Sequence, residues 1–154
     1  MRRRSQRGLS LVELIVAFTI MSLLAAMAVP MARGKVRREK ERELRYSLRE
    51  IRTAIDKYKD MCDQNAFGQK LGTECYPETL EMLVEGVQVA NDATGKKVRF
   101  LRRLPRDPFT KSTEWGMRST ADDPASLSWG GQNVFDVYSK TLEKSPNGES
   151  YSDW

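Results

Sequence analysis

The residue types that most often carry chemistry are scarce in this sequence, and their pattern excludes several kinds of active site. None of the 154 residues is a histidine, so a Ser-His-Asp triad, a histidine general base and a histidine metal site are all excluded. Cys62 and Cys75 are too far apart for a CxxC redox motif. The adjacent acids Asp122 and Asp123 precede a proline, where a solvated turn cap is a commoner role than a catalytic pair. We therefore expect no enzyme activity.

The two cysteines leave two possibilities open. In an oxidising compartment, a disulfide between Cys62 and Cys75 closes a loop of about 14 residues and stabilises the fold by about 3 kcal/mol in the chain-entropy model. The alternative is a pair of unpaired thiols. The location of this part of the chain decides between them.

Glu13 is the only charged residue in an apolar stretch of 24 residues, from Leu9 to Ala32. That length crosses a hydrocarbon core of about 30 Å as a helix, and it exceeds the apolar region of an ordinary signal peptide. A carboxylate deep in a membrane costs about 2.5–3.5 kcal/mol. Because the stretch contains no lysine or arginine, we expect the cationic partner of Glu13 to come from elsewhere.

Basic residues flank this apolar stretch on both sides. Arg2, Arg3, Arg4 and Arg7 precede it, and the positive-inside rule places that end in the cytoplasm. Further basic residues between positions 33 and 45 follow it, and they weaken the rule. The net charge of +5 is therefore largely local, whereas a nucleic-acid-binding protein spreads its basic residues over a folded face. We expect a membrane partner and no nucleic acid.

The N-terminal residues also resemble a known processing signature. Gly8-Leu9-Ser10-Leu11-Val12-Glu13 is similar to the cleavage site of type IV pilins and type II secretion pseudopilins, except that the family usually has Phe where Leu9 stands. The resemblance implies that a prepilin peptidase cuts between Gly8 and Leu9 and methylates the new amine. Glu13 then becomes the fifth mature residue, and the amine of Leu9 in a neighbouring subunit is its candidate partner.

Pro30 falls at mature position 22, where many family members have a proline. A proline inside a helix removes one backbone hydrogen bond and favours a kink, which would let packed subunits adjust in a filament. The alternative interpretation is that Pro30 marks the exit from the membrane.

Beyond the apolar stretch, helical periodicity continues in a charged sequence. Apolar residues recur at steps of four and three, forming one seam: Leu44, Leu48, Ile51, Ile55, Tyr58 and Cys62. This pattern predicts an amphipathic helix, so that one helix runs from Leu9 to about Asp63. A seam with Tyr and Cys makes a poor coiled coil, and we expect a sheet from the C-terminal half to cover it.

Short elements are predicted for the rest of the chain. Pro77 suits the first turn of a helix over Pro77–Glu85. Strands are expected over 87–90 and 98–101, joined by the turn-rich residues 91–95, and over 114–120 and 134–140. Residues 104–109 are expected to be extended, because each proline biases the preceding residue away from helix. Trp115, Trp129 and Trp154 are too scattered for a sugar-binding platform and are expected to pack in the core.

Two of these segments resemble the major pseudopilins of type II secretion. They are Tyr76-Pro77-Glu78-Thr79-Leu80-Glu81-Met82-Leu83 and Leu104-Pro105-Arg106-Asp107-Pro108-Phe109. The resemblance implies an α+β fold in which a long N-terminal helix, membrane-spanning in its first half and amphipathic in its second, packs on a small antiparallel β-sheet head. It divides the chain into a leader (1–8), a filament-core helix (9–32) and a periplasmic head (33–154). It also implies one calcium ion near Asn147, Glu149 and Asp153, with Asn147 standing where the family has an aspartate.

The function that the resemblance implies is structural. The chain would polymerise with itself into a periplasmic pseudopilus that drives protein export, with a prepilin peptidase, minor pseudopilins and an inner-membrane assembly platform as partners. It would cross the bacterial inner membrane once, with the N-terminus in the cytoplasm and the head in the periplasm. Two alternatives stay open: a type IV pilus subunit for adhesion, motility or DNA uptake, and a membrane-anchored periplasmic enzyme or binding domain.

Overall fold

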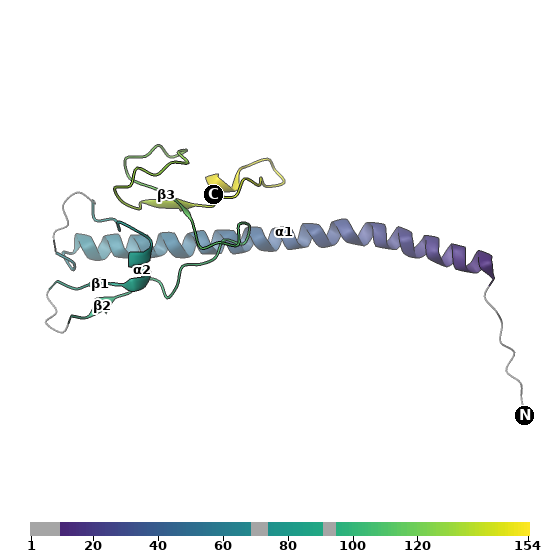
Figure 1. The fold of residues 1–154 in the computed structure, drawn as a ribbon, viewed down its shortest axis with the longest axis horizontal. Coiled ribbons are helices and arrows are strands. Elements are labelled where there is room, and N and C mark those ends of the chain that lie inside the picture. Colours follow the sequence, from purple (N-terminus) through teal and green to yellow (C-terminus); the bar gives the residue numbers. More distant parts are fainter. Residues whose placement is uncertain (1–9, 69–73, 91–94) are drawn as a thin grey trace, which may run out of the picture. The chain divides into compact units, whose positions relative to one another are not determined.

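The computed structural model describes residues 10–68, 74–90 and 95–154, except for the side chains of 27–32. The chain divides into two compact units, Met1–Glu39 and Lys40–Trp154, called here the N-terminal unit and the head unit. The order of elements is one long helix, one short helix, four short strands and a 3-10 turn (Figure 1). The predicted α+β class, with a long N-terminal helix followed by small antiparallel sheets, is confirmed.

The long helix α1 spans Leu11–Asp63, and the prediction that it ends at about Asp63 is confirmed. Its C-terminus is closed by a Schellman motif, in which Asn65 takes a left-handed conformation with φ 58°. The amide of Asn65 donates to the carbonyl of Cys62, and that of Ala66 donates to Met61. Asparagine tolerates this conformation better than most residues do, which is why the helix stops there.

The predicted apolar seam of α1 is the centre of the head unit's core. All six of its residues are buried, with Leu44, Ile51 and Tyr58 fully inaccessible to solvent. Side chains from the rest of the head unit cover the seam, including Phe67, Leu80, Leu83, Leu101, Trp115, Val134, Val137 and Tyr151. The ring of Tyr58 stacks on Phe67 at a centroid distance of 5.2 Å and meets Phe100 edge-on at 5.5 Å. The predicted cover from the C-terminal half is present, and it consists of two short strand pairs, which supply Val137, Met117 and Val87, together with the loops between them.

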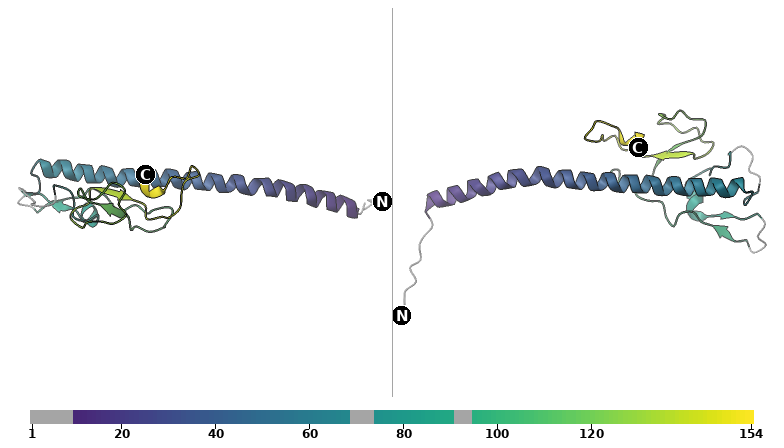
Figure 2. Two further views of the ribbon diagram at one scale, coloured as in Figure 1. Left: turned by 90° about the horizontal axis from the view of Figure 1, so that it is seen from above. Right: turned by 180° about the vertical axis from the view of Figure 1, so that it is seen from behind.

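The strands form two separate antiparallel pairs. Strand β1 (Val87–Gln88) pairs with β2 (Lys97–Val98), and β3 (Gly116–Arg118) pairs with β4 (Asp136–Tyr138). All four lie within the predicted strand regions or one residue outside, and they are shorter than predicted. The two-proline segment 104–109 lies between the two pairs in the sequence. In Figures 1 and 2 the strands lie alongside the C-terminal part of α1. The predicted turn residues 91–94 lie outside the described residues.

The short helix α2 spans Glu81–Glu85 and begins four residues after the predicted start at Pro77. The carbonyl of Pro77 accepts a hydrogen bond from the amide of Val134 at 2.8 Å. This long-range bond anchors the Pro77 backbone to a distant segment, so the helix begins only after it.

Candidate assembly surfaces

The first turn of α1 contains Glu13. Ser10 precedes the helix, its carbonyl accepts the first intrahelical bond from Leu14 at 3.2 Å, and Glu13 lies three residues after it. This Ser-x-x-Glu spacing matches a capping box, and the partial positive charge at a helix N-terminus favours a carboxylate. The helix N-terminus thus favours a carboxylate at this position, besides the predicted ion pair. Gly8 and Leu9 lie outside the described residues, and the pairing of Glu13 with the Leu9 amine stays a prediction.

The apolar residues before and after Glu13 are exposed on every side of the helix. Leu11, Phe18, Met21 and Leu23 are 75%, 73%, 69% and 66% exposed. The hydroxyl of Thr19 bonds within the helix to the carbonyls of Ile15 and Val16, at 2.7 and 2.9 Å, so this polar group is satisfied without water. A helix that is apolar all round needs lipid or protein around it, and no described residue of the chain supplies that cover.

The predicted membrane span 9–32 is only partly included in the described residues. Among the described residues, no helical stretch combines the length and apolarity that a membrane crossing requires. The predicted span 9–32 includes Leu9 and the side chains of 27–32, which lie outside the described residues. The side chain of Pro30 is among them, although the backbone of α1 is helical through that position.

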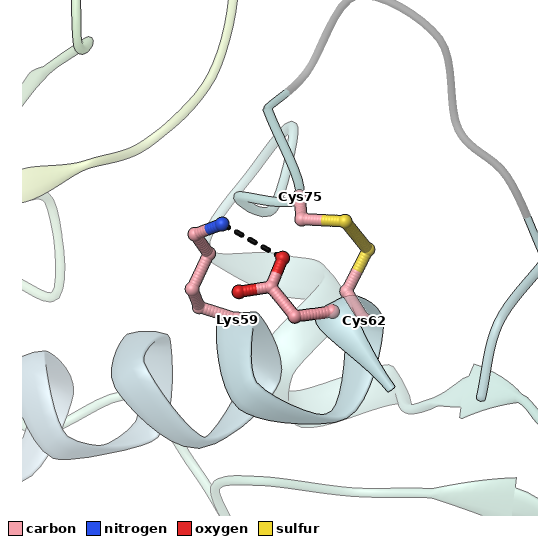
Figure 3. Close-up of a disulfide and its surroundings, with 4 residues drawn as sticks. Lys59, Cys62 and Cys75 are labelled. Atoms are coloured by element: carbon pink, nitrogen blue, oxygen red, sulfur yellow. Dashed lines mark hydrogen bonds and ion pairs between the residues drawn. A yellow bond between two sulfur atoms is a disulfide. The ribbon is translucent and has the colours of Figure 1, made fainter. Parts of the chain in front are cut away.

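A disulfide closes the loop after α1. Cys62, on the last turn of the helix, is bonded to Cys75 with a Cα–Cα distance of 5.5 Å (Figure 3). Beside it, the ammonium of Lys59 pairs with the carboxylate of Asp63 at 2.8 Å and lies 5.3 Å from the centroid of the Tyr76 ring. The hydrogen bond that the ammonium of Lys59 donates to Asp63 raises the pKa of Lys59 above its ordinary value. The disulfide thus connects the end of the long helix to the segment that leads into Tyr76.

The second family-like motif folds around a buried carboxylate. Asp107 has no exposed surface, and its Oδ1 accepts hydrogen bonds from the amides of Phe109 and Thr110 at 2.8 and 3.4 Å. Its Oδ2 accepts a hydrogen bond from the hydroxyl of Ser139, directly after β4. The indole of Trp115 donates to the carbonyl of Pro105 at 3.0 Å. Asp107 therefore fixes the turn of this segment and attaches it to the β3–β4 pair, so its role is structural.

An arginine–aspartate network joins α1 to the C-terminal half of the head unit. The guanidinium of Arg52 contacts Asp136 of β4 at 2.6 Å and donates to the main-chain oxygens of Val137 and Trp154 at 3.1 and 2.7 Å. Arg118 of β3 lies 3.5 Å from the same carboxylate. These residues could not be predicted from the sequence, because 84 positions separate Arg52 from Asp136 and no local pattern indicates the pair.

The three residues predicted to bind calcium lie in the C-terminal loop and are all exposed. A hydrogen bond from the amide of Ser145 to the carbonyl of Glu149, at 2.8 Å, closes this loop into a tight turn. Asn147 lies at the exposed end of that turn, and Asp153 belongs to the 3-10 turn Tyr151–Asp153. In the described part of the chain, no three His, Cys, Asp or Glu side chains come together as a metal site. This donor set fits calcium poorly, since calcium prefers six to eight oxygens.

The adjacent acids act as turn caps, as predicted. Asp122 accepts hydrogen bonds from the amides of Ser119 and Gly130 at 2.7 and 3.0 Å, and these bonds lower its pKa. Asp123 accepts one from Ala125 at 2.8 Å. Such local caps give no sign of a catalytic pair.

The three tryptophans have different environments. Trp115 is buried, Trp129 is 37% exposed, and Trp154 packs against the core while partly exposed. The core prediction is therefore right for Trp115, right in part for Trp154 and wrong for Trp129.

The fold, the all-round apolar helix and the processing signature define the class of type IV pilin-like proteins. The family profile of the prokaryotic N-terminal methylation motif matches residues 3–29. The chain is 31% identical over 113 residues to a type II secretion system core protein G of Klebsiella michiganensis, covering 71% of this chain and 72% of the relative. It is 28% identical to the protein of the same name from Pseudomonas aeruginosa, over 90% and 85% of the two chains, and 26% identical to that of Vibrio cholerae, over 96% and 88%. No solved structure matches significantly.

Within that class, the chain belongs to the family of type II secretion system core protein G, the G-type major pseudopilins. The sequence-based recognition of this family is thereby confirmed.

Proposed function

We propose that this chain is the repeating structural subunit of a type II secretion pseudopilus and polymerises with itself into a filament. Family membership supports the proposal. The observation that carries it is the apolar surface of residues 11–24, which is exposed all round in the single chain. Burying such a surface in lipid or against other copies stabilises by about 25 cal/mol per Å², so both an inserted and a polymerised state are favourable.

In this proposal Glu13 pairs with the methylated amine of Leu9 in a neighbouring copy. The amine exists only after a prepilin peptidase has removed residues 1–8, so cleavage prepares the subunit for assembly. An ionised carboxylate without a partner in an apolar surrounding costs about 2.5–3.5 kcal/mol. Pairing removes that cost and also sets how neighbouring helices align.

We infer that the subunit crosses the inner membrane once, with its N-terminus in the cytoplasm and its head in the periplasm. The four arginines before the apolar stretch support this orientation. The disulfide in the head unit is also in keeping with an oxidising compartment. Minor pseudopilins and an inner-membrane assembly platform are the further partners in this proposal. In this proposal the subunit contributes shape and helix packing to the filament and catalyses no reaction.

The experiment compares two substitutions of Glu13 in cells that assemble the filament. Glu13→Gln keeps the Ser-x-x-Glu/Gln capping box and removes the charge, whereas Glu13→Ala removes both. The proposal expects both variants to be cleaved and to assemble poorly, while Glu39→Ala, also on α1 and exposed, assembles normally. Normal filament yield from Glu13→Gln would show that the carboxylate serves only as a cap.

Mass spectrometry of the mature N-terminus tests the processing step. We expect a methylated Leu9 in the native chain and uncleaved protein in Gly8→Ala. A chain isolated from its envelope with Met1 intact contradicts the proposal.

Calcium binding near Asn147, Glu149 and Asp153 remains a separate proposal that rests on the family resemblance alone. Calorimetry with millimolar calcium tests this calcium proposal, and an absence of binding heat would contradict it.

A further inference from the structure

A cluster of basic residues follows the apolar stretch on the side where the positive-inside rule disfavours them. Four of the six positions after Ala32 are basic: Arg33, Lys35, Arg37 and Arg38. We call these four residues the basic belt. No acidic residue lies between Glu13 and Glu39, so this positive charge has no acidic neighbour within the segment. In the proposed orientation the belt crosses the membrane against the rule, and a favourable interaction on the periplasmic side has to offset that cost.

Three cations of the basic belt are available to a partner outside the chain. Arg33, Lys35 and Arg38 are exposed on α1. Within the part of the chain that the structure describes, no ion pair or hydrogen bond joins their side chains to another group. Arg37 is half-buried and has an interaction within the chain, so the inference depends on the other three.

The cations of the belt surround the helix. At 100° per residue, Arg38 lies about 140° and Lys35 about 200° around the axis from Arg33, so every half of the circumference contains a positive charge. A protein partner contacts one side of a helix, whereas lipid surrounds a membrane helix on all sides. The apolar residues 11–24 have the same all-round distribution. The pattern therefore favours lipid over a protein as the partner of the belt.

The position of the belt along α1 matches the headgroup layer of a membrane. From Arg33 to Arg38 the helix rises about 8 Å. A bilayer with a hydrocarbon core of about 30 Å and a total thickness of about 40–45 Å has a headgroup layer of about 5–8 Å on each side. The belt follows the predicted span 9–32 directly, so it lies at this depth when that span crosses the core. The long side chains of lysine and arginine can adjust to the level of the phosphates.

We propose that the basic belt binds the phosphate groups of anionic phospholipids on the periplasmic side of the membrane. The proposal rests on the proposed function, because it assumes the single crossing with the head in the periplasm. The guanidinium groups of Arg33 and Arg38 form bidentate hydrogen bonds to phosphate, and the ammonium of Lys35 binds as a point charge. This binding holds the end of the membrane segment at the headgroup level until the subunit leaves the membrane for the filament.

The test measures which lipid lies beside the belt of the full-length chain. Val36 lies within the belt and is 58% exposed, so Val36→Cys can be labelled with a fluorophore, while Cys62 and Cys75 are bonded to each other. The labelled chain is reconstituted in vesicles of phosphatidylcholine and phosphatidylglycerol. In parallel samples one of the two lipids has a nitroxide near the top of its acyl chain, at the same mole fraction, and the quenching by the two lipids is compared.

We expect phosphatidylglycerol to quench the label about two- to fivefold more than phosphatidylcholine, because an exposed ion pair changes a local equilibrium by up to about fivefold. In about 1 M salt the ratio is expected to fall, since the Debye length shortens from about 8 Å to about 3 Å. The leader arginines do not affect the measurement, because they lie at the other end of the apolar stretch, about 36 Å along the helix.

Three variants in the Val36→Cys background separate the belt from charge in general. The neutral variant Arg33→Gln/Lys35→Gln/Arg38→Gln is expected to bring the quenching ratio close to one. The exchange variant Arg33→Lys/Lys35→Arg/Arg38→Lys keeps the charges and is expected to keep the ratio. The matched control Arg49→Gln/Lys57→Gln/Arg102→Gln removes three exposed cations beside one hollow of the head unit and is also expected to keep it.

The outcomes distinguish this inference from the proposed function. Equal quenching by both lipids in the chain with an unaltered belt, or an unchanged ratio in the neutral variant, overturns the lipid site while the membrane crossing stands. If the neutral variant keeps the ratio but yields fewer filaments in cells, the belt contacts other copies and the lipid site is likewise overturned. A full-length chain that does not float with the vesicles overturns both this inference and the proposed crossing.

Discussion

Replacing Asp107 by asparagine tests the structural role assigned to the Leu104–Phe109 motif. The carboxylate is fully buried and accepts hydrogen bonds from two amides and one hydroxyl. Asparagine has nearly the same shape, but it keeps only one acceptor oxygen and adds an NH₂ group. In Asp107→Asn that NH₂ group must face either the two amides or the hydroxyl of Ser139.

The expected cost follows from the bonds that are lost. A hydrogen bond to a charged group contributes about 1.5–3 kcal/mol, and a buried donor left without an acceptor costs about 1–3 kcal/mol. The Thr110 bond is long, at 3.4 Å, and the hydroxyl of Ser139 can rotate to accept from the new NH₂ group. We therefore count about one lost charged bond and expect Asp107→Asn to lower the free energy of unfolding by about 2–3 kcal/mol.

Urea unfolding of the full chain in detergent measures this change, with tryptophan fluorescence as the signal. Asp123→Asn is the matched control, because its carboxylate accepts one local bond in an exposed loop and a surface change usually stays within about 0.5 kcal/mol. If Asp107→Asn lowers the stability no more than Asp123→Asn does, the buried carboxylate does not hold the segment in place and the reasoning fails.

Three further predictions concern other parts of the head unit. Replacing both Cys62 and Cys75 by alanine should lower the free energy of unfolding by about 3 kcal/mol, seen as a lower urea midpoint; an unchanged midpoint means that the bond adds no stability. Gly116→Ala should cost about 1–3 kcal/mol, because a Cβ there overlaps the Tyr138 ring on the paired strand, and unaltered amide chemical shifts in β3 and β4 would contradict this overlap. The pKa of Asp122, measured by NMR, should lie below its ordinary value, because backbone amides stabilise the charged form. The stability that this carboxylate adds is present above its unfolded-state pKa and disappears as the pH falls through its folded-state pKa. Asp122→Asn should therefore weaken the loss of stability in acid.

The elements predicted correctly from the sequence are those with a local cause. The seam from Leu44 to Cys62 repeats at helical spacing over 19 residues, and a pattern of that length determines both the helix and its buried face. The end of α1 could also be anticipated, because Asn65 is one of the few residue types that tolerate a left-handed cap. The Gly8–Glu13 signature identified the class without any structural information.

The parts that were not predicted depend on contacts between distant residues. The start of α2 follows a backbone hydrogen bond between Pro77 and Val134, and no residue near Pro77 in the sequence indicates that bond. The two-residue strands β1 and β2 are shorter than any periodic pattern can specify. In the same way, the Arg52–Asp136 pair joins elements whose proximity exists only after the core has formed.

The two parts of α1 differ in whether the same chain covers their apolar residues. In the head unit, the apolar seam is covered by the same molecule, so the sequence contains both the surface and its cover. In the N-terminal unit, the apolar residues 11–24 are exposed on all sides, and the proposed function assigns their cover to lipid and to other copies. The same holds for the carboxylate of Glu13, since its proposed partner belongs to another subunit. We therefore expect contacts between copies to bury the apolar residues of this segment and to neutralise the carboxylate of Glu13 together.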